Sequence, residues 1–174
     1  MYGVGADAGS AEAVRRLVAV RGRGEGKPIL VLVKDLAMAE TMATVSATAR
    51  RLAARFWPGP LTLVLPARAG LPLLLTAGTG TIGLRVPGHA VAATLVAQFG
   101  APVTAPSANP PGADAPRRLA DARAYFGDGV AVYLDGGELP GGASTVAALD
   151  ADELRVLRAG PVSEAALRAA LAER

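Results

Sequence analysis

The order of apolar runs along this chain constrains its fold more than any other feature. Short runs rich in Val, Leu and Ile alternate with stretches whose apolar residues recur at helical spacing, and two further runs follow in succession near the C-terminus. Alternating strands and helices are typical of parallel sheets, whereas two successive strands form an antiparallel hairpin. The chain is therefore expected to form one α/β domain with a mixed, partly antiparallel sheet.

The individual elements follow from apolar periodicity and from the turn residues between them. The expected strands are residues 28–34, 61–65, 81–86, 103–105, 130–134, 144–149 and 154–158. The expected helices are residues 11–20, 35–56 with a break near 44–46, 89–99, 118–126 and 163–172. Gly100 is expected to end the helix 89–99 in the left-handed conformation, which glycine adopts without strain.

Composition excludes several kinds of chemistry. The chain contains no cysteine, so disulfides, thiolate metal sites and thiol catalysis are excluded. His89 is the only histidine, which leaves almost nothing for a histidine-rich metal site or a Ser-His-Asp triad. The apolar stretches are interrupted well before the length of a membrane span, and the opening MYGVGADAG lacks a secretory pattern. A cytoplasmic protein is expected.

The basic residues are almost all arginine. Arg accounts for all but two of the 18 basic residues, and the net charge is +3. Guanidinium groups suit bidentate recognition of phosphate or carboxylate. A nucleic-acid surface would also fit, but no run of five or more basic residues occurs. The charge permits an anionic ligand without identifying one.

The segment APVTAPSANPPG, residues 101–112, predicts a stiff loop at the end of a short strand. Pro106 favours an extended approach to it. Ser107 and Asn109 lie two residues apart, so on an extended segment both side chains are expected to present polar groups to one ligand. The other interpretation is an ordinary proline-rich turn with an Asx-type cap.

A second candidate site is the glycine-punctuated loop VRGRGEGKPI at residues 20–29. Its glycines give the backbone freedom, so Arg21, Arg23 and Lys27 can converge on one anion, for which a polyphosphate is the natural candidate. The other interpretation is a solvated basic loop. The loop is not a Walker A sequence, and no GxGxxG follows a strand.

Arginines also occur on two of the expected strands. Arg85, in TIGLRVPGH, lies between apolar neighbours and needs an anionic partner, either a ligand carboxylate or a structural Asp or Glu. His89 follows at a helix start, as a cap or a base. Ser144 and Thr145 open one strand and Arg158 closes the next, a combination that also suits phosphate or carboxylate, although hairpin ends often look like this.

Trp57, the sole tryptophan, stands in the segment FWPGPLTLVL at residues 56–65. A large aromatic side chain beside a Pro-Gly-Pro turn is typical of a packing anchor. We expect Trp57 to hold the corner between a helix and a strand.

Five motifs, taken in order, resemble one family. WPGPLTLVL, TIGLRVPGH, APSANPPG, STVAAL and VLRAG together resemble the YrdC-like family of L-threonylcarbamoyl-AMP synthases, over nearly the whole chain from Tyr2 to Pro161. The resemblance implies a twisted, open α/β sheet with a positively charged concavity. It also implies an enzyme that condenses threonine, bicarbonate and ATP, with Mg²⁺, into threonylcarbamoyl-AMP and pyrophosphate. A threonylcarbamoyl-transferase complex would then modify adenosine 37 of tRNAs that read ANN codons.

The resemblance further implies roles for individual residues, and it implies no protein ligands for a metal. The family's KxR and SxN elements, which would be catalytic, fall on Arg21, Arg23, Ser107 and Asn109. The residues that would bind ATP are Arg23, Lys27, Thr81, Ser107 and Arg158. The residues that would bind threonine are Arg85, which takes the carboxylate, Ala105 and Ser144. This set suits the chemistry, because attack of a carbamate on the α-phosphate needs positioning and charge neutralisation but no enzyme nucleophile.

The chain departs from the family pattern in two places. Arg21 stands where the family usually has Lys, and a planar guanidinium does not replace a compact ammonium in every contact. YGVGADA resembles the segment that follows the family's Pro-Thr-(Glu/Asp)-Thr signature, but the signature itself is absent. We therefore expect a single domain over residues 1–174 that lacks an N-terminal strand and a threonine of the amino-acid site.

Two other functions stay open from the sequence. A YrdC-like relative with another acyl acceptor, as in hydrogenase maturation or antibiotic carbamoylation, would share the motifs but usually occurs in longer chains with additional modules. An RNA-binding protein would grip tRNA or double-stranded RNA through its phosphates, with steep salt dependence. Tyr125 and Tyr133 are the two candidates for base stacking, which makes single-strand recognition a poor fit.

Overall fold

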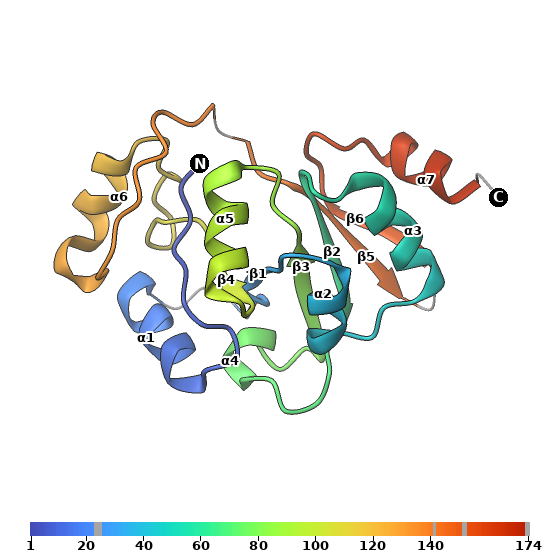
Figure 1. Ribbon diagram of the computed structural model, residues 1–174, viewed down its shortest axis with the longest axis horizontal. Coiled ribbons are helices and arrows are strands. Elements are labelled where there is room, and N and C mark those ends of the chain that lie inside the picture. Colours follow the sequence, from blue (N-terminus) through green and yellow to red (C-terminus); the bar gives the residue numbers. More distant parts are fainter. Residues whose placement is uncertain (23–25, 141, 151–152, 173–174) are drawn as a thin grey trace.

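The computed structural model describes residues 1–22, 26–140, 142–150 and 153–172 (Figure 1). Within these residues, six strands form one mixed sheet in the order β4-β1-β3-β2-β5-β6. The strands are β1 (Leu30–Leu32), β2 (Leu61–Pro66), β3 (Thr81–Arg85), β4 (Val103–Thr104), β5 (Thr145–Asp150) and β6 (Glu153–Arg158). β1 is parallel to β3 and β2 is parallel to β5, while the pairs β1–β4, β2–β3 and β5–β6 are antiparallel. The expected mixed α/β sheet is confirmed.

Seven α-helices lie in the described ranges, and side chains cap the N-termini of several of them. They are α1 (Ala11–Arg21), α2 (Leu36–Met42), α3 (Ala47–Phe56), α4 (Leu73–Thr76), α5 (Ala90–Phe99), α6 (Leu119–Phe126) and α7 (Glu164–Ala172), with a 3-10 turn η1 (Gly127–Gly129) after α6. Asp35 caps α2 and Ser46 caps α3, each accepting a bond from a backbone N–H, so the expected break between these helices is confirmed. Gly100 ends α5 with φ 74°, as expected.

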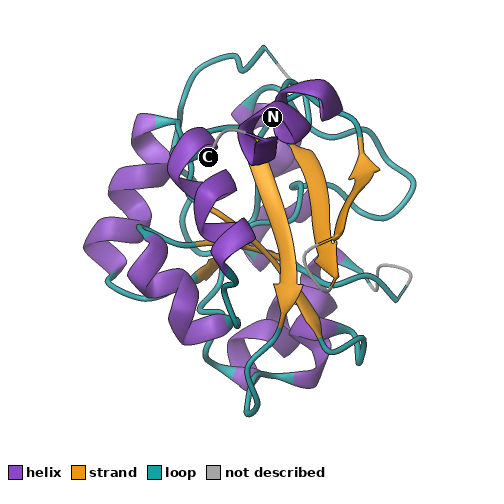
Figure 2. Cartoon of the chain, turned by 90° about the vertical axis from the view of Figure 1, so that its right-hand side faces the viewer, coloured by secondary structure: helices purple, strands orange, loops and turns teal. Residues whose placement is uncertain are grey.

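The helices gather on one side of the sheet (Figures 1 and 2). Alternate strand residues such as Leu63 and Leu84 are fully buried and meet apolar residues of the helices, among them Leu52 of α3, Val96 of α5 and Leu167 of α7. This single apolar cluster is the main core, and its burial is the chief stabilising contribution to the fold. None of the helices in the described part of the chain is long and apolar enough to cross a membrane.

A second, smaller apolar cluster lies beyond the β4 edge. It consists of Tyr2, Val4, Leu17, Ala108, Ala122 and Phe126. The N-terminal segment reaches it by running beside the segment that contains β4: the Thr104 N–H donates to Ala6 O over 2.8 Å, and the Ala108 N–H donates to Tyr2 O over 3.0 Å. The N-terminal residues therefore cover the open edge of the sheet.

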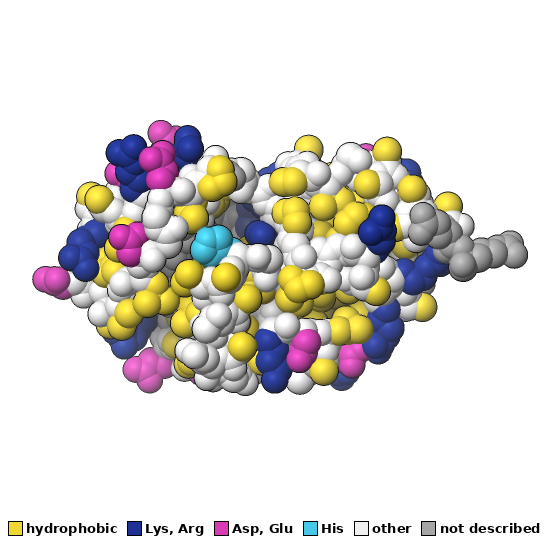
Figure 3. Space-filling view, turned by 45° about the horizontal axis from the view of Figure 1, so that its top comes forward, with side chains coloured by type: hydrophobic (Ala, Val, Ile, Leu, Met, Phe, Trp, Pro, Cys, Tyr) yellow, Lys and Arg dark blue, Asp and Glu magenta, His cyan; other side chains and the backbone are white. Residues whose placement is uncertain are grey.

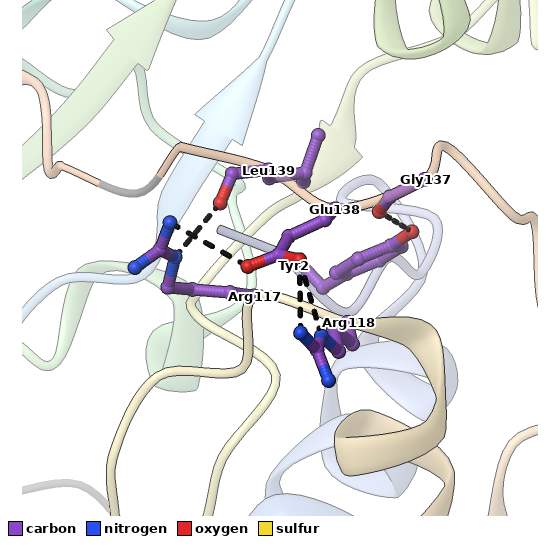
Figure 4. A network of polar contacts seen from close by, with 6 residues as sticks. All are labelled: Tyr2, Arg117, Arg118, Gly137, Glu138 and Leu139. Carbon is purple, nitrogen blue, oxygen red and sulfur yellow. Dashed lines mark hydrogen bonds and ion pairs between the residues drawn. The ribbon is translucent and has the colours of Figure 1, made fainter.

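A polar network ties the loop at residues 135–139 to this cluster (Figure 4). The Tyr2 hydroxyl donates to Gly137 O over 2.7 Å, and Arg117 Nε donates to Leu139 O over 3.0 Å. Glu138 accepts from Arg118 and forms an ion pair with Arg117. Because these ion pairs are exposed, they orient the loop more than they stabilise it.

The expected strand at residues 130–134 is wrong. These residues form no ladder with any described strand, and Val132 and Leu134 are 70% and 46% exposed. Their alternation of apolar residues matches a strand locally, but a strand forms only where a neighbour accepts its backbone hydrogen bonds. The short helix α4 was not predicted, and the strand expected at 28–34 is reduced to the three residues of β1.

Candidate functional site

The face of the sheet opposite the helices carries the predicted polar residues of β3. Ile82 and Leu84 point into the core and are fully buried, so Thr81, Gly83 and Arg85 lie on the opposite face. Gly83 leaves room for the neighbouring Thr62 side chain, since a Cβ on Gly83 would lie 3.3 Å from Thr62 Cγ2. Figure 3 shows that the molecular surface is hollowed in its upper middle, with basic side chains inside the hollow.

Four strand ends meet at one edge of this face. β3 ends at Arg85 and β6 ends at Arg158, whereas β2 and β5 begin there, because β2–β3 and β5–β6 are antiparallel and β2–β5 is parallel. Ser144 directly precedes β5. The topology therefore brings together residues that are up to 73 positions apart (85 to 158) in the sequence.

Arg85 is held by a backbone carbonyl and has no acidic partner. Its Nε donates to Gly59 O over 2.7 Å, and among the residues that the structure describes no carboxylate forms an ion pair with it. Burial, and then the charge of Arg158, lowers the pKa of the Arg85 guanidinium. Of the two partners that the sequence allowed, a structural Asp or Glu is not found in the described chain.

Arg158 and Ser144 form one unit. Arg158 Nε and Nη2 both donate to Ser144 O, over 3.0 and 2.9 Å, and Nη2 also lies 3.2 Å from Ser144 Oγ. Although the residue is exposed on its outer side, burial of the guanidinium against the sheet lowers its pKa. In the described ranges, Arg158 also lacks a carboxylate partner. This edge therefore carries two guanidinium groups for which the described ranges offer no carboxylate.

Arg21 and Ser107 form a second unit. Arg21, the last residue of α1, donates from Nε to Ser107 O over 2.9 Å and approaches Ser107 Oγ with Nη2 at 3.4 Å. Burial lowers the pKa of Arg21. The two predicted catalytic motifs are thus in contact at these residues. Arg23 lies outside the described residues, and Lys27 is exposed.

Asn109 is turned into its own loop. Its Nδ2 donates to Pro110 O over 3.1 Å and to Ala113 O over 2.7 Å, and its side chain is buried. In the described structure, Oδ1 has no hydrogen-bond partner. Ser107 and Asn109 therefore do not present equivalent groups: the amide nitrogen braces the turn, and only the amide oxygen is left for other contacts.

Two other predicted residues, Thr81 and Ala105, lie at a distance from Arg85. Thr81 lies at the opposite end of β3 from Arg85, about 13 Å away at 3.3 Å per residue, and its hydroxyl pairs with that of Thr79. The Ala105 N–H donates to Leu30 O over 2.7 Å, which places Ala105 across β1 from β3, roughly 10 Å away at the usual strand spacing. Thr81 and Ala105 therefore do not lie beside Arg85.

Some sequence interpretations are settled by local contacts. Trp57 Nε1 donates to Leu61 O over 2.8 Å across a cis Trp57–Pro58 peptide, and the ring packs against the core, so the expected corner anchor is confirmed. His89 occupies the N-cap position of α5 but its side chain accepts no capping bond. Tyr133 lies under the Arg123 guanidinium and donates to Gly127 O, so its ring is already engaged within the protein.

Sequence reasoning missed two parts of the site. The Gly59 carbonyl, which orients Arg85, carries no side-chain signal. Thr62 Oγ1 lies 2.8 Å from Ser144 Oγ, yet a threonine inside an apolar strand is a common β-former and attracts no attention. The segment WPGPLTLVL contains both groups, but it predicts a strand, a family motif and the Trp57 anchor without indicating either group.

Comparison with known proteins identifies the family. The family model of Sua5, YciO and YrdC, described as telomere recombination, matches residues 1–160. The chain belongs to this family. The family resemblance deduced from the five motifs is thereby confirmed.

Individual relatives agree with this assignment. The chain is 36% identical over 139 residues to the threonylcarbamoyl-AMP synthase of Pyrococcus abyssi, covering 79% of this chain and 41% of the relative. It is 42% identical over 166 residues to a putative threonylcarbamoyl-AMP synthase of Mycobacterium tuberculosis strain H37Rv, covering 94% and 76%. The solved structure of P. abyssi Sua5 complexed with L-threonine superposes with a TM-score of 0.92 at 34% identity, covering 98% of this chain and 51% of that one. The chain thus spans about half of the length, or less, of the Pyrococcus proteins.

Proposed function

We propose that this member of the Sua5/YciO/YrdC family forms L-threonylcarbamoyl-AMP and pyrophosphate from L-threonine, bicarbonate and ATP. The observation that carries the proposal is the pair of neighbouring guanidinium groups of Arg85 and Arg158, which have no carboxylate partner in the described chain. A site of this kind requires an anion, and both threonine and ATP supply one. The names of the relatives and the L-threonine bound to P. abyssi Sua5 support the choice of threonine.

Threonine would bind at the edge where β3 and β6 end. Arg85 Nε is engaged by Gly59 O, so its two Nη groups are left to grip the amino-acid carboxylate. Ser144 would add a hydroxyl, and Ala105 would bring backbone close to the substrate from across β1. The amino group of threonine is then free to react.

ATP would extend over the same face toward the second unit. Arg158, Thr81 and Ser107 would contact the nucleotide, with Arg23 and Lys27 adding positive charge from the loop after α1. Arg21, whose Nε is held by Ser107 O, would offer a fixed guanidinium to a phosphate oxygen. The contact supports catalytic roles for Arg21 and Ser107, whereas the roles proposed for Arg23 and Asn109 follow from the family resemblance, with Asn109 acting through its free Oδ1.

The reaction balances without an enzyme nucleophile. The threonine nitrogen attacks the bicarbonate carbon, and loss of water leaves a carbamate. A carbamate oxygen then attacks the α-phosphorus of ATP, the bond between that phosphorus and the bridging oxygen breaks, and pyrophosphate leaves. Fixed cations favour this step because negative charge develops on the phosphate oxygens in the transition state.

The described residues do not offer a protein-held metal site. No group of three or more His, Asp or Glu side chains in them is arranged to hold an ion. Mg²⁺, if it takes part, would accompany the phosphates of ATP as part of the substrate. No step above is assigned to it.

The decisive measurement is pyrophosphate release that depends on both threonine and bicarbonate. Replacing Arg85 by alanine removes two charged hydrogen bonds to the carboxylate, so KM for threonine should rise by about 100-fold. Arg168→Ala is the matched control, because Arg168 is exposed on α7 and pairs with Glu164. Its kinetics should equal those of the wild type.

The alternatives give different results in the same assay. Release without threonine would indicate a relative with another acyl acceptor. Tight, salt-sensitive binding of double-stranded RNA without any release would favour an RNA-binding protein. If the proposal holds, the product would pass to a threonylcarbamoyl transferase acting on tRNA, in the cytoplasm.

A further inference from the structure

Thr62 is a buried hydroxyl under the Arg85–Arg158 site. It lies on β2, and because Leu63 pairs with Leu84, Thr62 is the cross-strand neighbour of Arg85. Only 3% of Thr62 is exposed. Its Oγ1 lies 2.8 Å from Ser144 Oγ, and within the described chain this is the only hydrogen bond of the Thr62 side chain.

The Thr62 and Ser144 hydroxyls cannot both donate across their single contact. Thr62 and Ser144 each carry one hydroxyl hydrogen, and the bond between them uses only one of the two. Arg158 Nη2 lies 3.2 Å from Ser144 Oγ and can only donate. One hydroxyl hydrogen is therefore left without an acceptor in a buried place, which is costly until a ligand supplies one.

The surroundings of Thr62 and Ser144 indicate which of the two hydroxyl hydrogens lacks an acceptor. If Thr62 only accepted, its own hydrogen would be trapped inside the sheet, where no described acceptor other than Ser144 Oγ reaches it. With Thr62 as the donor to Ser144, this hydrogen has an acceptor. Ser144 Oγ then accepts from both Thr62 and Arg158, which uses its two lone pairs, and its own hydrogen is the one that turns to the site.

We propose that Thr62 is a positioning residue that makes the Ser144 hydroxyl a hydrogen-bond donor to the bound substrate. Together with Arg85 and Arg158, this hydroxyl completes a site made of donors alone, which selects a carboxylate over a neutral amide. The identity of the ligand, threonine, rests on the proposed function. The contact between Thr62 Oγ1 and Ser144 Oγ is part of the structure, whereas its direction belongs to the proposal, since either hydroxyl could donate across 2.8 Å.

The test compares L-threonine with L-threoninamide by calorimetric titration. Thr62→Val removes the donor but keeps a β-branched side chain, and it should lower the affinity for L-threonine about tenfold, the size of one charge-assisted hydrogen bond. The affinity for L-threoninamide should change little. Thr62→Ser keeps the hydroxyl and should restore the preference. Thr76→Val is the matched control, since Thr76 is a buried threonine on α4 whose hydroxyl donates to Leu73 O.

A double-variant cycle separates positioning from a general structural role. If Thr62 acts through Ser144, adding Thr62→Val to Ser144→Ala should cause no further loss of threonine affinity. A further loss equal to that of the single Thr62→Val variant would overturn the proposal. So would an unchanged preference for the carboxylate in Thr62→Val, or a wild type without such a preference. If thermal melting shows that Thr62→Val is unfolded, Thr62→Ala carries the same expectations.

The proposed reaction can fail independently. If the wild type prefers L-threonine over L-threoninamide but releases no pyrophosphate, the synthase proposal is wrong while the role of Thr62 is still decided by the binding data. If pyrophosphate is released and Thr62→Val retains the full preference for L-threonine, the synthase proposal stands and the role proposed for Thr62 is wrong.

Discussion

Replacing Gly160 by alanine should damage the fold and the site together. Gly160 lies two residues after Arg158, where the chain passes close to the start of β5. A Cβ on it would stand 2.4 Å from the Thr145 nitrogen, 2.7 Å from the Ser144 carbonyl carbon and 2.8 Å from the Ala143 oxygen. All three are backbone atoms, so no flexible side chain can move aside, and the two segments must separate.

The size of the effect follows from these distances. Relief of the closest contact requires a shift of about 1 Å, and overpacking of this kind typically costs about 1–3 kcal/mol. The smaller backbone freedom of alanine in the unfolded chain returns about 0.4–1 kcal/mol. A net loss of about 1 kcal/mol in the free energy of unfolding should lower the melting temperature by about 2–4 °C in a domain of this size.

The shift also strains the bonds that hold the site. The Thr145 hydroxyl donates to Val162 O over 2.7 Å and accepts from the Val162 N–H over 3.0 Å, and both bonds cross the same contact. Arg158 would lose its alignment on Ser144, so threonine-dependent pyrophosphate release should fall with the melting temperature.

Scanning calorimetry and the release assay check the prediction against Gly136→Ala. A Cβ on Gly136 would lie 3.6 Å from His89 Cε1, an ordinary contact, so this control should melt within about 1 °C of the wild type or slightly above it. A Gly160→Ala variant that melts like the wild type would refute the reasoning, because the close approach of the two segments would then not constrain the fold.

Two further predictions concern the charge of the site and the core. Arg85→Lys places an ammonium where burial, and then Arg158, lower the pKa of a basic group, so its charged form is lost as pH rises. The threonine affinity of the variant relative to the wild type should fall as the pH rises, beginning below the ordinary lysine pKa of about 10.4, and a constant ratio in calorimetric titrations would contradict this. Leu63→Ala removes a fully buried side chain of β2 and should cost about 2–5 kcal/mol in urea unfolding, whereas a loss below about 1 kcal/mol would mean that the core refills the space.

The elements with strong local signals were predictable. The helix expected at 11–20 is α1, and the strands expected at 61–65 and 81–86 are β2 and β3, since periodicity and flanking turn residues act within a few positions. Residues 130–134 show the limit of such signals, because their alternation resembles a strand that has no neighbour to pair with.

The candidate site likewise contains residues that the sequence indicated and contacts that it did not. Arg85 stood out because an arginine among apolar strand residues requires an anion, and Ser144 and Arg158 stood out as polar ends of a hairpin. Their contact with each other, and the nearness of Arg85, depend on the order of the strands. Asn109 was expected beside Ser107 at a ligand, but the turn after it offers two carbonyl acceptors that only the folded loop brings within reach.

By itself, the amino-acid sequence determined the class of fold, most of the elements, the family and the types of residue available for chemistry, because these depend on local pattern and on composition. Only the tertiary structure decided that Arg85 has no acidic partner in the described chain, that Gly59 O orients it, and that a threonine 82 positions before Ser144 hydrogen-bonds its hydroxyl. The physical reason is that hydrogen bonds and charge interactions act over a few ångströms in space. Which groups come that close is decided by strand order and register, and these are set by contacts between distant parts of the chain.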